Sequence, residues 1–402
     1  MTNGQTPLLE SAIAAAIADA ASAGEPLLIA GNGTKLGMLR PVQAARSIST
    51  RDHTGITLYS PQELIVSARA GTPLQELEAT LAEQGQHMIS EPPDLSALLR
   101  APDRPQTIGG IVATNLSGPR RVAWGATRDH VLGIRAVTGW GEIIHSGGRV
   151  LKNVTGLDLC KLLSGSHGTL GMITEATLKV LPAPEATGTL LLPGLDATAG
   201  VAALAAGLGS PFSVSAAAWL PAECAARVAD LAPLGCSAAL LRIEDFARSV
   251  TYRTEKLRQT LAFSQGEILD DATSRAVWRA VRDAVPLPAA PTDAVWRVSV
   301  RPSAGPGVLS AVAAASVRGY LDWGGGLVWL AGPAETATHA AVEAAARAAH
   351  GTWMLLRAPE SLRTAVRVVP PEPPPLAAIT RRVKAALDPR GVLNPGRLYA
   401  GL

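Results

Sequence analysis

The hydrophobic pattern of the first 180 residues predicts short helices and strands in alternation. Two helices are expected, Glu10–Ala23, ended by Gly24, and Thr72–Gln84, with Thr72 as N-cap, Pro73 at its first position and Gly85 after its end. The strands are expected at Pro26–Ala30, Thr57–Tyr59, Leu64–Ala68, Ile134–Thr138, Glu142–His145 and Lys179–Leu181.

From about Thr187 to Pro359 strand and helix patterns alternate again, which predicts an α+β layer with helices covering one face of a sheet. The strands are expected at Ser213–Leu220, Ala238–Ile243, Val295–Arg301, Leu327–Ala331 and Thr352–Arg357. The helices are expected at Ala247–Ala262, Asp271–Val285, Gly307–Val317 and Glu335–His350. Pro370–Pro375 is predicted to be a stiff extended spacer before a last helix, Ala377–Leu387.

A chain of 402 residues is too long for one typical hydrophobic core, so the sequence predicts two domains. We place the first domain at residues 1–184 and the second, an α+β domain, at residues 185–369. Residues 370–402 form the proline-rich linker, the last helix and the tail. The fold class expected for the whole chain is α+β.

Composition excludes several classes of protein. The net charge is only +3, no cluster of five Lys or Arg occurs and aromatic residues make up 4%, so nucleic acid is not an expected partner. Three cysteines at unrelated spacings indicate reduced thiols rather than disulfides, zinc or an iron–sulfur cluster. No metal site is expected, because no two of the seven histidines share a ligand spacing on one helix face. No run of about 18 apolar residues occurs, so we expect a soluble, cytoplasmic protein.

Glycine-rich segments gather in the first half of the chain, at Gly31–Gly37, Thr107–Gly118, Trp124–Gly133 and Gly165–Glu175. Glycine has no Cβ, so such segments let a flat or phosphorylated ligand touch backbone N–H groups directly. One such segment could be an ordinary turn. Several in order, alternating with strand-like runs, predict a large cofactor that extends along one domain.

Gly31–Gly37 follows a predicted strand but matches neither common phosphate loop. Gly37 comes one position late for a Gly-x-Gly-x-x-Gly fingerprint, and Lys35 is not preceded by glycine as in a Walker A loop. A strand followed by free N–H donors and a lysine still suits a diphosphate. At this point an ordinary glycine turn stays open as the alternative.

Taken together, these motifs resemble the FAD-binding domain of the vanillyl-alcohol oxidase / p-cresol methylhydroxylase (PCMH) superfamily. Within it, the chain is most similar to the FAD-binding E subunits of bacterial glycolate oxidases, from about Leu27 to Pro182 and again in the tail Leu387–Arg397. The resemblance implies a two-domain PCMH-type fold whose tail returns to the FAD domain, and it implies these cofactor-binding residues: Gly31, Asn32, Gly33, Thr34, Lys35, Leu36, Pro92, Pro93, Thr107, Gly109, Gly110, Asn115, Ser117, Gly118, Gly168, Thr169, Gly171 and Ile173. Asn394 and Arg397 are candidates for stabilising the reduced flavin, with a simple C-terminal latch as the alternative.

The sequence indicates loops that bind a cofactor, but it does not indicate which residues carry out catalysis. Gly31–Gly37 carries no His, Cys or Tyr for a covalent link, so we expect non-covalent FAD. Ser166 and His167 are adjacent but form no nucleophile elbow, which argues against a hydrolase. Relatives that oxidise 2-hydroxy acids carry histidines in Gly-Asp-Gly-Asn-x-His and Glu-His-Gly motifs, whereas this chain reads Trp323–Trp329 without one. His339 and His350 fall on a predicted helix and its end, so the catalytic residues stay unknown.

Three hypotheses about function remain. In the first, implied by the resemblance, the chain is the FAD subunit of a glycolate oxidase complex that oxidises glycolate to glyoxylate. A flavoprotein sister subunit would then hold the catalytic base, and an iron–sulfur subunit would relay electrons towards quinone. The complex would be cytoplasmic, or peripheral at the inner face of the membrane through its partners. The second is a self-sufficient FAD-dependent 2-hydroxy-acid or alcohol dehydrogenase, and the third is a flavin-free structural subunit.

Overall fold

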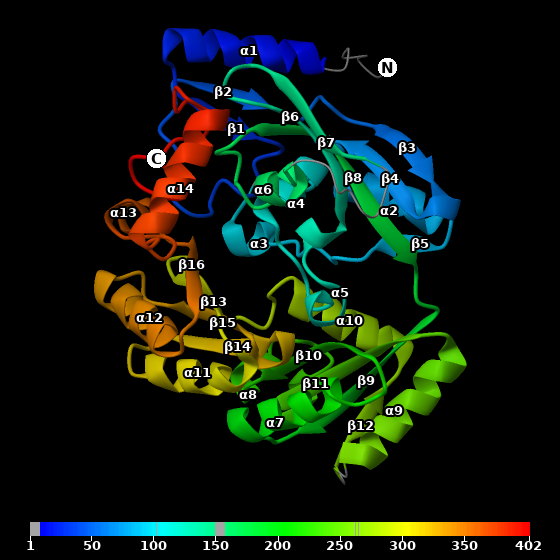
Figure 1. The fold of residues 1–402 in the computed structure, drawn as a ribbon. Helices are drawn as coiled ribbons and strands as arrows, with labels where there is room; N and C mark the ends of the chain where they lie inside the picture. Colours follow the sequence, from blue (N-terminus) through cyan, green and yellow to red (C-terminus); the bar gives the residue numbers. More distant parts are fainter. Residues whose placement is uncertain (1–8, 102, 149–156, 262, 264) are drawn as a thin grey trace.

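The structure is a computed structural model that describes residues 9–101, 103–148, 157–261, 263 and 265–402. Two antiparallel sheets dominate it, one built from the first half of the chain and one from the second (Figure 1). The mixture of helices and sheets confirms the predicted α+β class. The last helix, α14 (Pro374–Leu387), lies beside the first half of the chain, so the C-terminal segment returns to the N-terminal half (Figure 1).

The first sheet has six strands in the order β3-β4-β8-β6-β7, with β5 paired to β8. Its strands are β3 (Ile56–Ser60), β4 (Ile65–Arg69), β5 (Gln86–Met88), β6 (Val131–Val137), β7 (Ile143–Gly147) and β8 (Met172–Pro182). Helices α2 (Leu74–Ala82) and α4 (Ile108–Thr114) contribute their buried leucine, isoleucine and valine side chains to the same core.

A smaller unit joins the start of the chain to its end. Helix α1 (Glu10–Ala23) packs with a two-stranded parallel sheet of β1 (Leu27–Ala30) and β2 (Arg46–Ser49). The tail residues Val392 and Leu393 belong to this core, and Leu393 bridges to Leu27. The loop that follows β1 is therefore held next to the C-terminal tail.

The second sheet has eight antiparallel strands in the order β12-β9-β11-β10-β14-β15-β13-β16. The strands are β9 (Ala186–Pro193), β10 (Val214–Leu220), β11 (Ala238–Asp245), β12 (Glu267–Leu269), β13 (Ala294–Ser299), β14 (Arg318–Asp322), β15 (Leu327–Gly332) and β16 (Thr352–Arg357). The longer helices of this half are α7 (Ala197–Leu208), α9 (Ala247–Leu261), α10 (Asp271–Arg282), α11 (Gly305–Ala313) and α12 (Thr336–Ala348). Shorter helices of the chain are α3 (Ser96–Leu99), α5 (Arg121–Trp124), α6 (Leu159–Leu163), α8 (Ala222–Ala225) and α13 (Glu360–Ala365).

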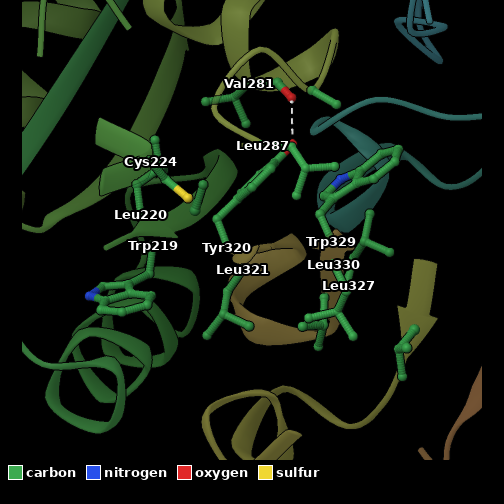
Figure 2. Packing of buried hydrophobic residues seen from close by; sticks show 14 of the residues in the cluster. Trp219, Leu220, Cys224, Val281, Leu287, Tyr320, Leu321, Leu327, Trp329 and Leu330 are labelled. Atoms are coloured by element: carbon green, nitrogen blue, oxygen red, sulfur yellow. Dashed lines mark hydrogen bonds between the residues drawn. The ribbon is translucent and has the colours of Figure 1, made fainter. Parts of the chain in front are cut away.

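The two faces of the second sheet differ in chemistry. Helices α7, α11 and α12 cover the face turned away from the first sheet, whereas α10 and α5 lie on the side that faces it (Figure 1). In Figure 2, Tyr320 and Trp329 point to one side of the sheet and Leu321 and Leu330 to the other. We call the side of Tyr320 and Trp329 the inner face, because the Tyr320 hydroxyl donates to the Val281 carbonyl of α10 at 3.2 Å.

Several element boundaries differ from the predictions. Helix α2 begins at Leu74 with Pro73 as N-cap, because the Thr72 hydroxyl bonds to the backbone of Gly55 instead of capping the helix. Helix α11 ends at Ala313, a turn follows, and strand β14 begins at Arg318. Strands β14, β2 and β9 and helix α7 were not predicted from the sequence. The proposed proline spacer is shorter than predicted, because Pro374 and Pro375 open α14.

The chain crosses from the first sheet to the second between Pro182 and Ala186, close to the predicted boundary at residue 184. The larger hydrophobic core nevertheless includes residues of the N-terminal half, among them Leu39 and Leu99. The division at 184 and 369 stays a prediction. Among the described helices, none is both long and apolar enough to cross a membrane.

Candidate functional site

A pocket of about 730 Å³, including its open mouth, lies where β1, the start of α4, the segment before β8 and the C-terminal tail meet. It brings together residues that are more than 360 positions apart in sequence, such as Ile29 and Asn394. Fourteen of the predicted cofactor residues line it: Gly31, Asn32, Gly33, Thr34, Lys35, Leu36, Thr107, Gly109, Gly110, Gly168, Gly171, Ile173, Asn394 and Arg397.

The loop after β1 presents backbone donors to this pocket. Among the described residues, the amides of positions 31–35 donate no hydrogen bond within the chain. Gly33 has φ +81°, a left-handed conformation that glycine adopts without strain. A Cβ on Gly31 would lie 2.3 Å from the Thr107 Oγ1, so only glycine lets the loop pack this closely against α4. The loop is thus shaped to offer N–H groups to an anion.

Two cations, the half-buried Lys35 and the buried Arg397, reinforce this preference. The Lys35 Nζ donates to the Gln106 Oε1 at 2.9 Å, and burial, partly opposed by Asp94, lowers the pKa of Lys35 to about 8. The Arg397 guanidinium donates to the carbonyls of Lys35, at 2.8 Å, and Arg40, at 2.9 Å. No Asp or Glu is among the described residues that line the pocket. The site therefore carries uncompensated positive charge, which suits a diphosphate.

The tail residues hold the pocket together. The Asn394 Oδ1 accepts from the Ile29 amide at 2.8 Å, and its Nδ2 donates to the His167 carbonyl at 2.9 Å. Arg397 likewise donates its hydrogen bonds to the backbone carbonyls of Lys35, Leu36 and Arg40. This geometry is that of a C-terminal latch, the alternative left open by the sequence, and the latch fixes the position of the loop after β1.

Residues Thr107–Gly118, expected to be a ligand loop, begin with helix α4. The first amides of α4 are satisfied within the chain, because Ile108 donates to the Thr72 carbonyl and Gly109 to the Ala70 carbonyl. Gly109 is needed for packing, since a Cβ there would lie 2.6 Å from the Ala70 Cβ. Gly110 faces open space: a Cβ built on it would have only the Thr107 Oγ1 within 4 Å, at 3.3 Å. This helix therefore contributes a flat wall rather than N–H donors.

Six predicted residues lie outside the pocket wall: Pro92, Pro93, Asn115, Ser117, Gly118 and Thr169. Three of them, Asn115, Ser117 and Gly118, lie between α4 and α5. The Asn115 Oδ1 accepts from the Arg128 amide at 2.9 Å, and the Gly118 carbonyl accepts from the Trp323 Nε1 at 3.1 Å. The Thr169 carbonyl instead accepts from the Lys384 Nζ of α14.

His167 also belongs to the pocket wall, although it was not among the residues predicted from the sequence. It lines the pocket in a left-handed conformation, with φ +53°, and burial together with Arg397 lowers its pKa to about 3. Its imidazole is thus neutral at physiological pH. The neighbouring Ser166 Oγ is buried without a hydrogen-bond partner among the described residues. The available signal was the position of His167 between Gly165 and Gly168, in the fourth glycine-rich segment.

The histidines of the second half lie away from the pocket. His339 is buried on the outer side of the sheet, where its Nδ1 accepts from the Trp296 Nε1 at 3.1 Å. His350 is exposed just past the end of α12. Within the described part of the chain, no group of three or more His, Cys, Asp or Glu could hold a metal ion.

Comparisons with known proteins agree with this geometry. Residues 6–147 match the family model described as an FAD binding domain. The glycolate oxidase subunit GlcE of Escherichia coli is 33% identical over 378 residues, which cover 94% of this chain and 93% of that protein. The glycolate oxidase subunit GlcD of Bacillus subtilis is 34% identical over 41% of this chain and 34% of its own length.

A solved structure shows that the fold extends over nearly the whole chain. An alkyldihydroxyacetonephosphate synthase superposes with a TM-score of 0.66, at 15% identity, over 95% of this chain and 75% of that one. The free amides of the 31–35 loop, the absence of Asp and Glu from the described lining residues and the glycines of the wall fit FAD, whose diphosphate needs donors and whose rings need close approach to the backbone. The chain belongs to the family of the glycolate oxidase subunit GlcE, within the FAD-linked oxidoreductases, and its cofactor is FAD.

Proposed function

We propose that this chain is the FAD-bearing subunit of a glycolate oxidase complex that oxidises glycolate to glyoxylate and passes the electrons to an iron–sulfur partner. The observation that carries the proposal is the pocket with free amides at positions 31–35 and the cations Lys35 and Arg397, with no Asp or Glu among its described lining residues. It is supported by similarity to GlcE over almost the full length of both chains. When bound, FAD supplies the acceptor for the hydride of the substrate.

The pocket residues hold the cofactor in separable ways. The amides of the 31–35 loop and Lys35 hold the diphosphate, and Arg397 fixes the carbonyl side of that loop. Gly110 and Gly168 provide wall without side chains, and Asn394 joins the two sides of the pocket. The attachment is proposed to be non-covalent, so acid precipitation should leave yellow flavin in the supernatant.

The partner subunits are part of the same proposal. Removal of the substrate hydroxyl proton requires a positioned base. Neither His339 nor His350 lines the pocket or lies on the inner face of the second sheet. We therefore assign the histidine-based machinery to a flavoprotein sister subunit and the onward electron transfer to an iron–sulfur subunit. The complex is proposed to be cytoplasmic or attached peripherally to the membrane through these partners.

FAD affinity should fall as pH rises through about 8, the pKa of Lys35 in the cofactor-free structure. Below that pH Lys35 is already charged, so binding the diphosphate requires no proton. Above it the neutral amine must take up a proton to pair with the phosphates, which weakens binding by at most about tenfold per pH unit. Quenching of flavin fluorescence during titration at several pH values measures this dependence.

The matched variants are Lys35→Met and Lys35→Arg. The methionine variant should bind FAD more weakly than wild type below pH 8, with a flatter profile. The arginine variant should keep its positive charge at every pH tested, so its FAD affinity should not fall above pH 8. If the FAD affinity of Lys35→Met still fell above pH 8 as in wild type, the proton taken up on binding would belong to another group.

The test of the proposed function is purification of the complex from native cells, followed by flavin and iron analysis and rapid mixing with glycolate. We expect FAD in this chain, iron in a co-purifying subunit, and glycolate-dependent bleaching in the complex but not in the isolated chain. A colourless chain that takes up no FAD on titration would overturn the proposal. Rapid bleaching of the isolated chain would replace it with the self-sufficient dehydrogenase.

A further inference from the structure

The inner face of the second sheet carries charged side chains at the junction with the first half of the chain. Arg242 and Glu244 lie on β11, Arg297 on β13, Asp322 on β14 and Arg357 on β16. Strand pairing places Arg297 opposite Trp329, which points to this face (Figure 2). Buried charge is costly unless it is paired, so each of these groups requires a partner.

Most of them have one. Arg242 donates two hydrogen bonds to the Glu91 carboxylate, at 2.8 and 3.0 Å. Arg120 does the same to Glu244, at 2.6 and 3.0 Å. The Arg357 guanidinium donates to backbone carbonyls, including that of Leu98 at 2.8 Å. These contacts neutralise or solvate their guanidinium groups, so they leave no donor fork for a ligand.

Arg297 is different. Its side chain makes no hydrogen bond and no ion pair with the described residues, and its Nε is buried without a partner. The guanidinium carbon lies 5.4 Å from the ring centre of Trp323 and 5.0 Å from that of Trp329. Burial, opposed by Asp322, lowers the pKa of Arg297 to about 10, so it stays charged at neutral pH. The residue as a whole keeps partial exposure, which leaves a route for a small ligand.

Two neighbours favour an anion there. Arg121 of α5 lies 4.4 Å from the ring centre of Trp323, so a second guanidinium without a carboxylate hydrogen bond contacts the same indole. Asp322 is the acid whose charge acts most strongly on Arg297. Its Oδ1 accepts a hydrogen bond from the Trp323 amide at 2.7 Å. Burial raises the pKa of Asp322 to about 7, so at neutral pH it is only partly ionised. The negative charge of Asp322 therefore does not fully neutralise the positive charge of Arg297.

We propose that Arg297, between Trp323 and Trp329, binds the carboxylate of a small 2-hydroxy or 2-oxo acid. A guanidinium presents a planar fork that matches a carboxylate, and flanking indoles restrict the ligand to a small one. The Trp323 Nε1 bond to the Gly118 carbonyl places this site beside the predicted cofactor residues that follow α4. The inference rests on the proposed function and adds a substrate-carboxylate site in this chain, whichever subunit supplies the base.

The test is calorimetric titration of the FAD-loaded chain with glycolate and glyoxylate, with glycolamide as the uncharged probe. We expect wild type to bind the two acids but not the amide, and Arg297→Gln to bind them roughly tenfold to a hundredfold more weakly. Arg297→Lys, which keeps the charge but loses the fork, should fall between them. Arg301→Gln, at an exposed arginine near the same strand, should bind like wild type.

A thermal melt of each variant separates ligand binding from a structural role. Because Arg297 has no hydrogen-bond partner among the described residues, Arg297→Gln should melt at or above the wild-type temperature. A lower melting temperature, unchanged glycolate affinity in Arg297→Gln, or no carboxylate binding by an FAD-loaded wild-type chain would each overturn the inference. Loss of FAD from the wild-type chain would instead mark failure of the proposed function, so the two failures are distinguishable.

Discussion

Replacing Gly110 with phenylalanine is expected to abolish FAD retention while leaving the chain folded. Gly110 lines the pocket, and the space around its missing side chain is open except for the Thr107 Oγ1 at 3.3 Å. A benzyl group would therefore occupy pocket volume instead of displacing core atoms. Flavin absorbance per protein after gel filtration measures retention, and circular dichroism with thermal melting reports whether the chain stays folded.

Two control variants make this result specific. Gly307→Phe adds the same group to α11, where nothing lies within 4 Å of the would-be Cβ, and it should retain FAD fully. Gly110→Ala should lose less FAD than the phenylalanine variant and stabilise α4 by up to about 1 kcal/mol, because alanine favours helix over glycine. A folded Gly110→Phe protein with a full complement of FAD would show that the cofactor lies elsewhere.

Replacing Glu91 with glutamine is expected to reduce the free energy of unfolding by about 3 to 5 kcal/mol. Glu91 accepts both hydrogen bonds of the Arg242 fork and one from the Arg120 amide, at 3.3 Å. Once Glu91 has lost its charge, Arg242 and Arg120 share the Glu244 carboxylate, which lies 3.3 Å from Arg242 and 2.6 Å from Arg120. Denaturant titration measures the loss. Glu223→Gln, which disturbs an exposed pair with Arg318, should change little.

The same network sets the response to acid. Burial alone would raise the pKa of Glu91 and of Glu244, but the Arg242 and Arg120 guanidiniums outweigh it and hold both pKa values below normal. A lowered folded-state pKa contributes stability above the unfolded value, about 4.3, and loses it as pH falls further. Wild type should therefore lose stability steeply below about pH 4, and Glu91→Gln less so. Parallel curves for the two proteins would contradict the assignment.

Local sequence determined the parts of the molecule whose structure depends on near neighbours. Helix α1 runs over Glu10–Ala23 as predicted, because helical spacing of Ile13 and Ile17 forms its buried face and Gly24 ends it. The loop after β1 was also foreseen, since only glycine tolerates its left-handed and closely packed positions. The resemblance to an FAD-binding family, now confirmed, rests on the same local signals.

Local pattern was a poorer guide where a segment's role depends on contacts from elsewhere. Thr72 has the chemistry of an N-cap, yet its hydroxyl bonds to Gly55, 17 residues earlier. Strand β14 follows helix α11 within an alanine-rich stretch whose composition favours helix. It forms because Tyr320 and Leu321 complete the sheet between β10 and β15.

The sequence by itself determined the cofactor class and the glycine backbone of the loop after β1, because glycine conformations and strand or helix periodicity are properties of adjacent residues. Only the tertiary structure decided which charges are paired. The fold brings Arg397 to the loop of Lys35 and matches Arg242 to Glu91 across 151 positions. It leaves Arg297 against two indoles, with no carboxylate bonded to it in the part of the chain that the structure describes. Such pairings depend on the approach of distant segments at about 3 Å, and no periodicity along the chain encodes that distance.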